Sequence, residues 1–447
     1  MARIPASEYR ELARLGFPVL ITQLGIITVS FADTMMVGAY GTNELGAAAF
    51  VSNLFLVPIV ALIGFSNGMT PILGALFGRR QLREAGTSLR AGVVMNVAAA
   101  AVFTLVMGAL FFLLPHFGQP EELLPLIRPY YLIILSSVIF NAVFTCCQNA
   151  CNGLTDTAMP MWIMIGGNAF NILGNYLLIF GHWGFPELGL MGAGLSTALS
   201  RVLMAVAIVT GLQWRRRYAV LREGVALRAS RQTFLKVWKT SYPIMILNGV
   251  ECFLWAVGAI VCGWFGTPQL ASYQIANTMG QFGFMIYISV GVAVTVRVAN
   301  FTGVKDIKGI DTSSRAGVRL MMLLATLASL GFIFGGSNLF GLFTQDEAVI
   351  KAGLPLILPL VLYQYFDALQ VNYGGALRGT GDVKPLMAVA VVSYILVGGG
   401  FLFLMAMGFD MGNVGVYYSF SVTLLCAAVM LFHYFRKAAR KIAENAD

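Results

Sequence analysis

The strongest constraint on this chain is a series of twelve long apolar runs. They occupy residues 12–36, 47–76, 91–114, 127–151, 158–181, 189–213, 238–263, 270–300, 315–335, 350–377, 385–407 and 412–435. A helix needs about 20 apolar residues to cross a bilayer, and each run is of that order. Only 11% of residues are charged, against about 25% in soluble domains. The sequence therefore predicts an all-α integral membrane protein with twelve transmembrane helices.

The charged residues indicate how these helices are oriented. The net charge is +9, and many of the basic residues lie in short clusters at 79–83, 214–224 and 436–441, between or after apolar runs. Loops after even-numbered runs carry most of the Lys and Arg, the distribution expected of cytoplasmic loops. We therefore expect a multi-pass protein of the inner (plasma) membrane, surrounded by the lipid bilayer, with both termini cytoplasmic. The same clustering argues against nucleic acid as a partner.

The two halves of the chain repeat each other. LGFPVL (15–20) matches TSYPIM (240–245), GTNELGA (41–47) matches GTPQLAS (266–272), and NGLTDTAMP (152–160) matches RGTGDVKP (378–385). A nearly constant offset of about 225 residues indicates duplication. We expect an N-terminal lobe at 1–213, a cytoplasmic linker at 214–237 and a C-terminal lobe at 238–447. Six helices in each half predict lobes related by pseudo-two-fold symmetry along the membrane normal, which is typical of transporters.

Glu251 is an acid deep inside an apolar run. It follows Lys239 by 12 residues, which places it about 18 Å along a helix and near the bilayer midplane. Asn248 and Trp255 lie on the same helical face. A charge at this depth costs about 2.5–3.5 kcal/mol on insertion scales, and such acids mark functional sites by default. The alternative is a neutral acid that hydrogen-bonds two helices together.

Asp367 is a second acid at similar depth. Tyr363, Asp367, Gln370 and Gly374 form one helical stripe, and Arg378 marks the cytoplasmic end of that run. Two acids at one depth can share a proton or a cation. Further polar residues on neighbouring faces, including Gln274, predict the lining of a wet cavity.

Asp33, Asn171 and Asn175 form the corresponding group in the first half. A carboxylate with amide oxygens suits a small hard cation such as Na⁺, although the asparagines can equally serve helix packing. Arg201 also lies inside an apolar run; it can pair with a buried carboxylate or extend to the cytoplasmic face.

Together these features resemble the multidrug and toxic compound extrusion (MATE) family, in particular its NorM-type branch. The resemblance is carried by PVLITQLGIITVSFADTMMVG (18–38), NGVECFLWAVG (248–258), YQYFDALQ (363–370) and the paired turns NGLTDTAMP and RGTGD. It implies that Glu251 and Asp367 are the paired acids of the C-terminal lobe, with Tyr363 one turn before the second acid. It also implies that Asp33, Asn171 and Asn175 form the cation site of the N-terminal lobe.

The resemblance further implies an antiporter that exports small organic cations and amphipathic drugs in exchange for Na⁺ or H⁺ by alternating access. Asn175 stands where some relatives have a second acid, so the choice of ion stays open, with Na⁺ weakly favoured. We expect a monomer without a cofactor, and no enzyme, because the three histidines lie at the ends of the runs and no HExxH motif is present. A lipid-linked substrate flippase of the same superfamily is the alternative, although it would need a cationic cavity.

Overall fold

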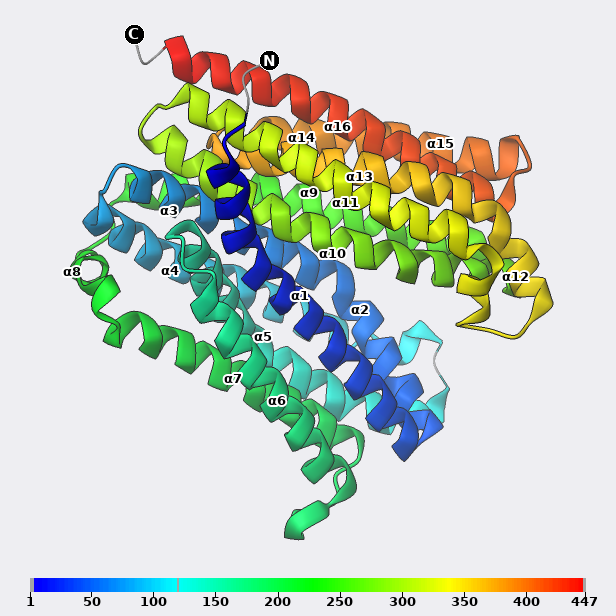
Figure 1. Ribbon diagram of the computed structural model, residues 1–447. Coiled ribbons are helices and arrows are strands. Elements are labelled where there is room, and N and C mark those ends of the chain that lie inside the picture. Colours follow the sequence, from blue (N-terminus) through cyan, green and yellow to red (C-terminus); the bar gives the residue numbers. More distant parts are fainter. Residues whose placement is uncertain (1–3, 119, 445–447) are drawn as a thin grey trace. The chain divides into compact units, whose positions relative to one another are not determined.

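The regular elements of this protein are helices throughout the part of the chain that the computed structural model describes, residues 4–118 and 120–444 (Figure 1). Within those residues, twelve helices are long and apolar enough to cross a membrane. Each contains or closely overlaps one of the predicted runs. The prediction of an all-α protein with twelve membrane-spanning helices is confirmed.

The helices generally extend beyond the apolar runs, because hydropathy marks only the part of a helix that lies in hydrocarbon. The first six spans are formed by α1 (Ala6–Tyr40), α2 (Thr42–Asn67) with α3 (Met69–Gly78), α4 (Leu82–Phe111), α5 (Leu124–Gly153), α6 (Ala158–Phe180) and α7 (Leu190–Trp214). The last six are formed by α9 (Arg231–Trp264), α10 (Thr267–Gly303), α11 (Ile307–Gly341), α12 (Glu347–Gly353) with α13 (Ile357–Gly379), the segment 385–408, and α16 (Gly412–Glu444).

The segment 385–408 departs from the regular helix that the sequence predicts. It begins as α14 (Pro385–Val389), continues as a π-helix over Ala390–Gly399, returns to α-helix as α15 (Gly400–Phe403) and ends in a π-helix over Leu404–Gly408. π-Helices are rare and are often found at functional sites. This one carries Tyr394.

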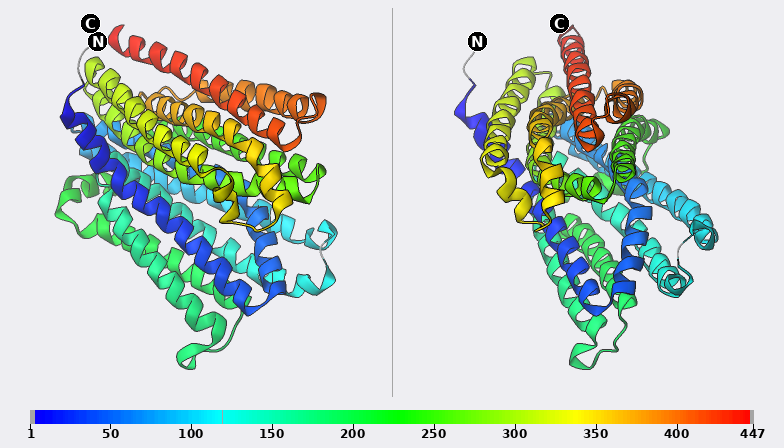
Figure 2. Two further views of the ribbon diagram at one scale, coloured as in Figure 1. Left: turned by 45° about the vertical axis from the view of Figure 1, so that its right-hand side comes forward. Right: turned by 90° about the vertical axis from the view of Figure 1, so that its right-hand side faces the viewer.

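The chain forms two compact units. The N-unit contains residues 18–245, and the C-unit contains residues 1–17 with 246–447. In the N-unit, α5 packs against α2, α4 and α7, and α6 packs against α7; in the C-unit, α13 packs against α10, α11 and α16 (Figures 1 and 2). The chain thus passes from one unit to the other within α1 and within α9, each time close to a proline, Pro18 or Pro243. The lobe boundaries expected from the repeat stay a prediction.

The first turns of α1 are fixed to the C-unit by a buried ion pair. Both carboxylate oxygens of Glu8 accept hydrogen bonds from Arg297, at 3.0 and 2.6 Å, and Ser313 donates to the same carboxylate at 2.5 Å. Glu8 is only 7% exposed. Removing one member of such a pair would leave the other charge buried and unpaired, which is strongly destabilising.

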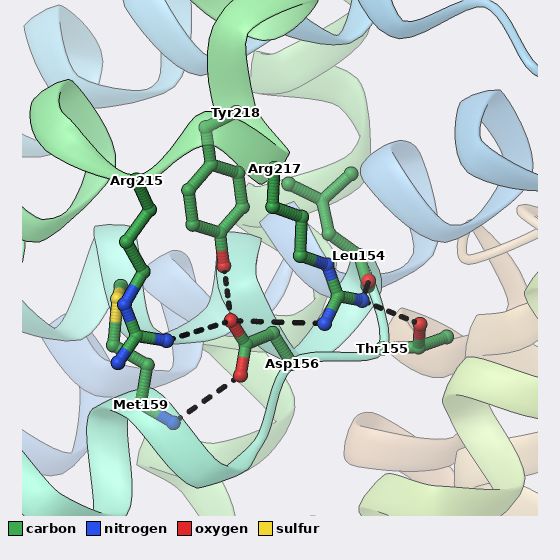
Figure 3. Close-up of polar contacts among 7 residues, drawn as sticks. All are labelled: Leu154, Thr155, Asp156, Met159, Arg215, Arg217 and Tyr218. Atoms are coloured by element: carbon green, nitrogen blue, oxygen red, sulfur yellow. Dashed lines mark hydrogen bonds and ion pairs between the residues drawn. The ribbon is translucent and has the colours of Figure 1, made fainter.

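The expected linker at 214–237 is folded and packed on the N-unit (Figure 3). Asp156, in the turn between α5 and α6, is 6% exposed. It accepts a hydrogen bond of 2.6 Å from the hydroxyl of Tyr218 and forms ion pairs with Arg215 at 3.5 Å and Arg217 at 3.9 Å. Arg217 also donates to the carbonyl oxygen of Leu154 at 2.9 Å. Burial raises the pKa of Tyr218, with the carboxylate of Asp156 adding to the effect, so the phenol stays protonated as a donor.

The next helix, α8 (Ala219–Ala226), lies directly against α4. A Cβ atom at Gly224 would overlap the carbonyl oxygen of Arg83, so the two backbones touch. Arg83 forms an ion pair of 2.7 Å with Glu223, and Arg90 donates to the carbonyl oxygen of Leu227 at 3.0 Å. Residues 215–227 are therefore held on the N-unit by side-chain and backbone contacts.

Replacing Asp156 by Ala should release this packed segment. Tyr218 would lose a charged acceptor, and a hydrogen bond to a charged group contributes about 1.5–3 kcal/mol; Arg215 and Arg217 would lose an ion-pair partner. We expect trypsin to cleave faster at the arginines of 215–228. The matched control is Asp382→Ala, since Asp382 is the counterpart of Asp156 in the second repeat and is partly exposed. Equal cleavage rates in wild type and Asp156→Ala would contradict this assignment.

Candidate functional sites

Asp33, Asn171 and Asn175, predicted from sequence as one group, lie together in the N-unit. The amide nitrogen of Asn175 donates to the carboxylate of Asp33. The amide of Asn171, in the orientation that satisfies both of its ends, donates to Asp33 at 2.9 Å and accepts from the backbone N–H and hydroxyl of Thr197 at 3.3 and 3.2 Å. Helices α1 and α6 therefore meet at this carboxylate, and α7 reaches it indirectly, through the contact of Thr197 with Asn171.

Thr197 belongs to this group, and the sequence analysis missed it. Its neighbour Ser196 donates to the backbone carbonyl oxygen of Asn171 at 2.7 Å, and a Cβ atom at Gly174 would lie only 2.4 Å from Ser196 Oγ. Glycine at position 174 thus allows α7 to approach α6 closely. A hydroxyl residue in an apolar run, such as Thr197, is a weak signal, because only the packing of α6 on α7 shows what its side chain contacts.

Arg201 lies one turn after Thr197 on α7. Its guanidinium donates to the hydroxyl of Ser137 on α5 at 2.8 Å, and it interacts electrostatically with Asp33 and Tyr130. Of the two possibilities raised by the sequence, the structure favours association with a buried carboxylate. Asp33 and Arg201 give this group one negative and one positive charge.

The donor set of the N-unit group fits a small monovalent cation. The side-chain oxygen of Asn175 is buried and has no hydrogen-bond partner in the described structure, so it is available as a neutral oxygen ligand beside the Asp33 carboxylate. Hard cations take carboxylate and amide oxygens. No cluster of three or more His, Cys, Asp or Glu suited to a metal occurs among the described residues. Alternatively, the Asp33 carboxyl can take up a proton.

Glu251 lies in the C-unit, on α9. Its carboxylate accepts a hydrogen bond of 3.1 Å from the hydroxyl of Tyr394, and that hydroxyl accepts one of 2.9 Å from the amide of Gln370 on α13. The π-helix that carries Tyr394 therefore connects α9 to α13 through hydrogen bonds. Tyr394 was not predicted, since a tyrosine in an apolar run is ordinarily a packing residue.

Asp367 is nearly completely buried on α13, at 1% exposure. It interacts electrostatically with Glu251, so the two predicted acids are brought together in the C-unit. One carboxylate oxygen of Asp367, Oδ2, has no hydrogen-bond partner within the described residues. An ionised carboxylate in such a place is costly, and a bound cation or proton would remove that cost.

An aromatic cluster packs around Tyr363, one turn before Asp367. The ring of Trp255 lies 5.7 Å from that of Tyr363 and 4.0 Å from that of Phe420, both edge to face. Tyr417 lies 6.4 Å from Tyr363, and the hydroxyl of Tyr273 donates to the backbone of Trp255. Aromatic faces and carboxylates together can bind an organic cation.

Asn248 and Gln274 do not join the acids through hydrogen bonds in the part of the chain that the structure describes. Asn248 is partly buried one turn before Glu251, and Gln274 is exposed on α10. Their predicted role in binding stays a prediction.

Comparison with known proteins identifies the family. The family model MatE matches residues 18–177 and again residues 243–404. The chain belongs to the MatE family. The two matches begin 225 residues apart, in agreement with the offset of the sequence repeat.

Relatives agree over nearly the whole length. The multidrug resistance protein NorM of Aliivibrio fischeri is 26% identical over 430 residues, covering 95% of this chain and 93% of the relative. A eukaryotic MATE transporter has the same fold, with a TM-score of 0.86, 19% identity and 99% of both chains covered. A MOP superfamily transporter from Pyrococcus furiosus, described as having a binding pocket of reverse polarity that suggests a different function, also shares the fold, with a TM-score of 0.84 at 15% identity and coverage of 98% and 97%.

The paired acids of the C-unit lead to a direct test. We expect Glu251→Gln and Asp367→Asn each to weaken drug binding by about tenfold or more, equivalent to about 1.4 kcal/mol, while leaving expression unchanged. The control is Glu347→Gln, an exposed acid of the same unit. Drug resistance of cells and binding to the purified protein are the measurements. Wild-type drug resistance and wild-type drug affinity in both variants would show that the two acids are not part of the binding site.

Proposed function

We propose that this protein is a multidrug efflux transporter that exports organic cations and amphipathic drugs in exchange for Na⁺ or H⁺. The observation that carries the proposal is the buried pair Glu251 and Asp367 beside an aromatic cluster, with one oxygen of Asp367 free of donors. The name of the Aliivibrio fischeri relative, a multidrug resistance protein, supports drugs as the substrates. We also propose that it works as a monomer in the plasma membrane, with both termini in the cytoplasm.

Exchange follows from competition for these carboxylates. Carboxylates and aromatic rings attract a cationic drug in a low-dielectric setting. When a coupling ion or proton neutralises an acid, that attraction weakens and the drug is released. A drug and an ion that neutralise the same acids cannot both bind with full affinity.

We propose Na⁺ as the coupling ion, with the N-unit group as its site. The unpartnered oxygen of Asn175 beside Asp33 supports this assignment. Protonation of Asp33 is the competing possibility, because a carboxylate in a low-dielectric interior can be neutralised by a proton as well as by a metal ion.

Alternating access requires backbone that can bend. The packed residues 215–227 argue against a rocking motion about a flexible 214–237 linker. Pro18 and Pro243 are better candidates, because a proline lacks the N–H that bonds to the preceding turn. Both lie near the points where α1 and α9 pass between the units.

The alternatives receive less support. A flippase for lipid-linked pyrophosphates needs a cationic cavity, whereas at the C-unit site two acids outnumber the one guanidinium. The Pyrococcus furiosus transporter shares the fold and is described as having a binding pocket of reverse polarity that suggests a different function, so the polarity of the pocket, and not the fold, is the feature to compare. An enzyme needs a reactive group, and a substrate-dependent turnover assay on purified protein would test for one.

The coupling ion can be identified in vesicles. We expect ethidium efflux to be driven by an imposed Na⁺ gradient at fixed pH, and Asp33→Asn to abolish that dependence by removing the only charged oxygen ligand of the predicted site. Vesicles without protein are the control. Efflux that responds to a proton gradient and not to Na⁺ would assign the coupling to protons instead.

Competition is a separate test. Raising Na⁺ or lowering pH should weaken ethidium binding, and ethidium should weaken ion binding by the same factor, because linkage is reciprocal. Titrations of the purified protein over a range of Na⁺ and pH measure both. An ethidium affinity that does not change with Na⁺ concentration or with pH would rule out the exchange mechanism.

A further inference from the structure

Arg378 introduces a positive charge beside the acids of the C-unit. It lies in the last turn of α13, and its Nε donates to the carbonyl oxygen of Gly374 at 3.1 Å. A Cβ atom at position 374 would lie 3.4 Å from Nη2 of Arg378. The side chain therefore folds back along its own helix, over the space that the glycine leaves, toward Gln370 and Asp367.

This orientation brings the guanidinium within electrostatic range of Glu251 and Tyr394. Tyr394 connects Glu251 to Gln370 through hydrogen bonds. Gln370 lies on α13, about two turns before Arg378. The other titratable groups that interact with Glu251 are Asp367 and Tyr363 of α13 and its own neighbour Cys252 on α9. The C-unit site thus combines two carboxyl groups with one guanidinium.

We propose that Arg378 determines which ligand charge this site accepts: its guanidinium offsets one of the two carboxylates, so the site favours singly charged organic cations over doubly charged ones. Gly374 contributes by leaving room for the guanidinium. The inference rests on the proposed function, since it concerns the substrates of the same site.

The size of the effect follows from Coulomb's law. A unit charge about 12 Å away, at an effective dielectric constant of about 20, changes affinity about tenfold for each charge on the ligand. A dication is repelled by Arg378 twice as strongly as a monocation. Removing the guanidinium should therefore change the ratio of the two affinities by about tenfold.

Ethidium and propidium are suitable probes, because they share a ring system and differ in one additional cationic group. Their affinities would be measured on the purified full-length protein in alkaline buffer without Na⁺, where protons and ions compete least. We expect Arg378→Gln to reduce the preference for ethidium over propidium by about tenfold. Arg378→Lys should keep the preference, and so should the control Arg319→Gln, which removes an exposed arginine of the same unit.

A second variant keeps every charge in the chain. Gly374→Leu places a side chain where the guanidinium lies, so it should move Arg378 away from Glu251 and reduce the preference in the same direction. The ratio of affinities is the readout, because a loss of folded protein lowers the number of binding sites for both dyes equally and leaves the ratio of the two affinities unchanged.

Three outcomes would overturn the inference. A wild-type ratio in both Arg378→Gln and Gly374→Leu would show that the guanidinium does not act on ligand charge. Loss of the preference in Arg378→Lys as complete as in Arg378→Gln would show that shape matters and charge does not. Wild-type protein that binds neither dye would refute the proposed function, and the inference with it.

Discussion

The free-energy cost of placing a charge in a low-dielectric interior determines how the buried polar groups of both units are arranged. Glu8 is buried with Arg297 and Ser313, and Asp33 is held by two amides. Glu251 accepts from a tyrosine. Asp367 differs, because one of its oxygens has no donor among the described residues although the residue is almost fully buried. It is the one carboxylate with such a buried, unpartnered oxygen in that part of the chain, which makes it a candidate site for a positive ligand.

The sequence predicted those features that hydrophobicity and repetition encode directly. All twelve helices were predicted, since a bilayer demands long apolar runs. The acids were also recognisable, because a carboxylate in an apolar run is conspicuous. Thr197 and Tyr394 were not, since a hydroxyl in an apolar run becomes informative only when a neighbouring helix places it against a carboxylate or an amide. The packing of residues 215–227 could not be predicted for the same reason. From sequence alone, their arginines indicate a solvated cytoplasmic loop.

One family model matches both halves of the chain, but the halves differ at the turn that follows α5 in the first and α13 in the second. In the first half, the turn after α5 is held through Asp156 by residues that follow α7. In the second half, the corresponding position, Asp382, is partly exposed, and the preceding arginine, Arg378, faces inward. The counterpart of Arg378 in the first half is Asn152. The turn after α5 thus holds the segment that follows α7. Beside the turn after α13, Arg378 instead extends its guanidinium toward the buried acids.

The π-helix at Ala390–Gly399 sets the orientation of the residues that follow it in this span. A π turn takes up about one residue more than an α turn, so ten residues of π-helix hold about two residues more than the same number of α turns. Deleting one residue before Tyr394 would rotate its side chain by about 100° relative to the start of the helix, away from Glu251 and Gln370. The stretch therefore constrains the length of the chain as well as the identity of its residues.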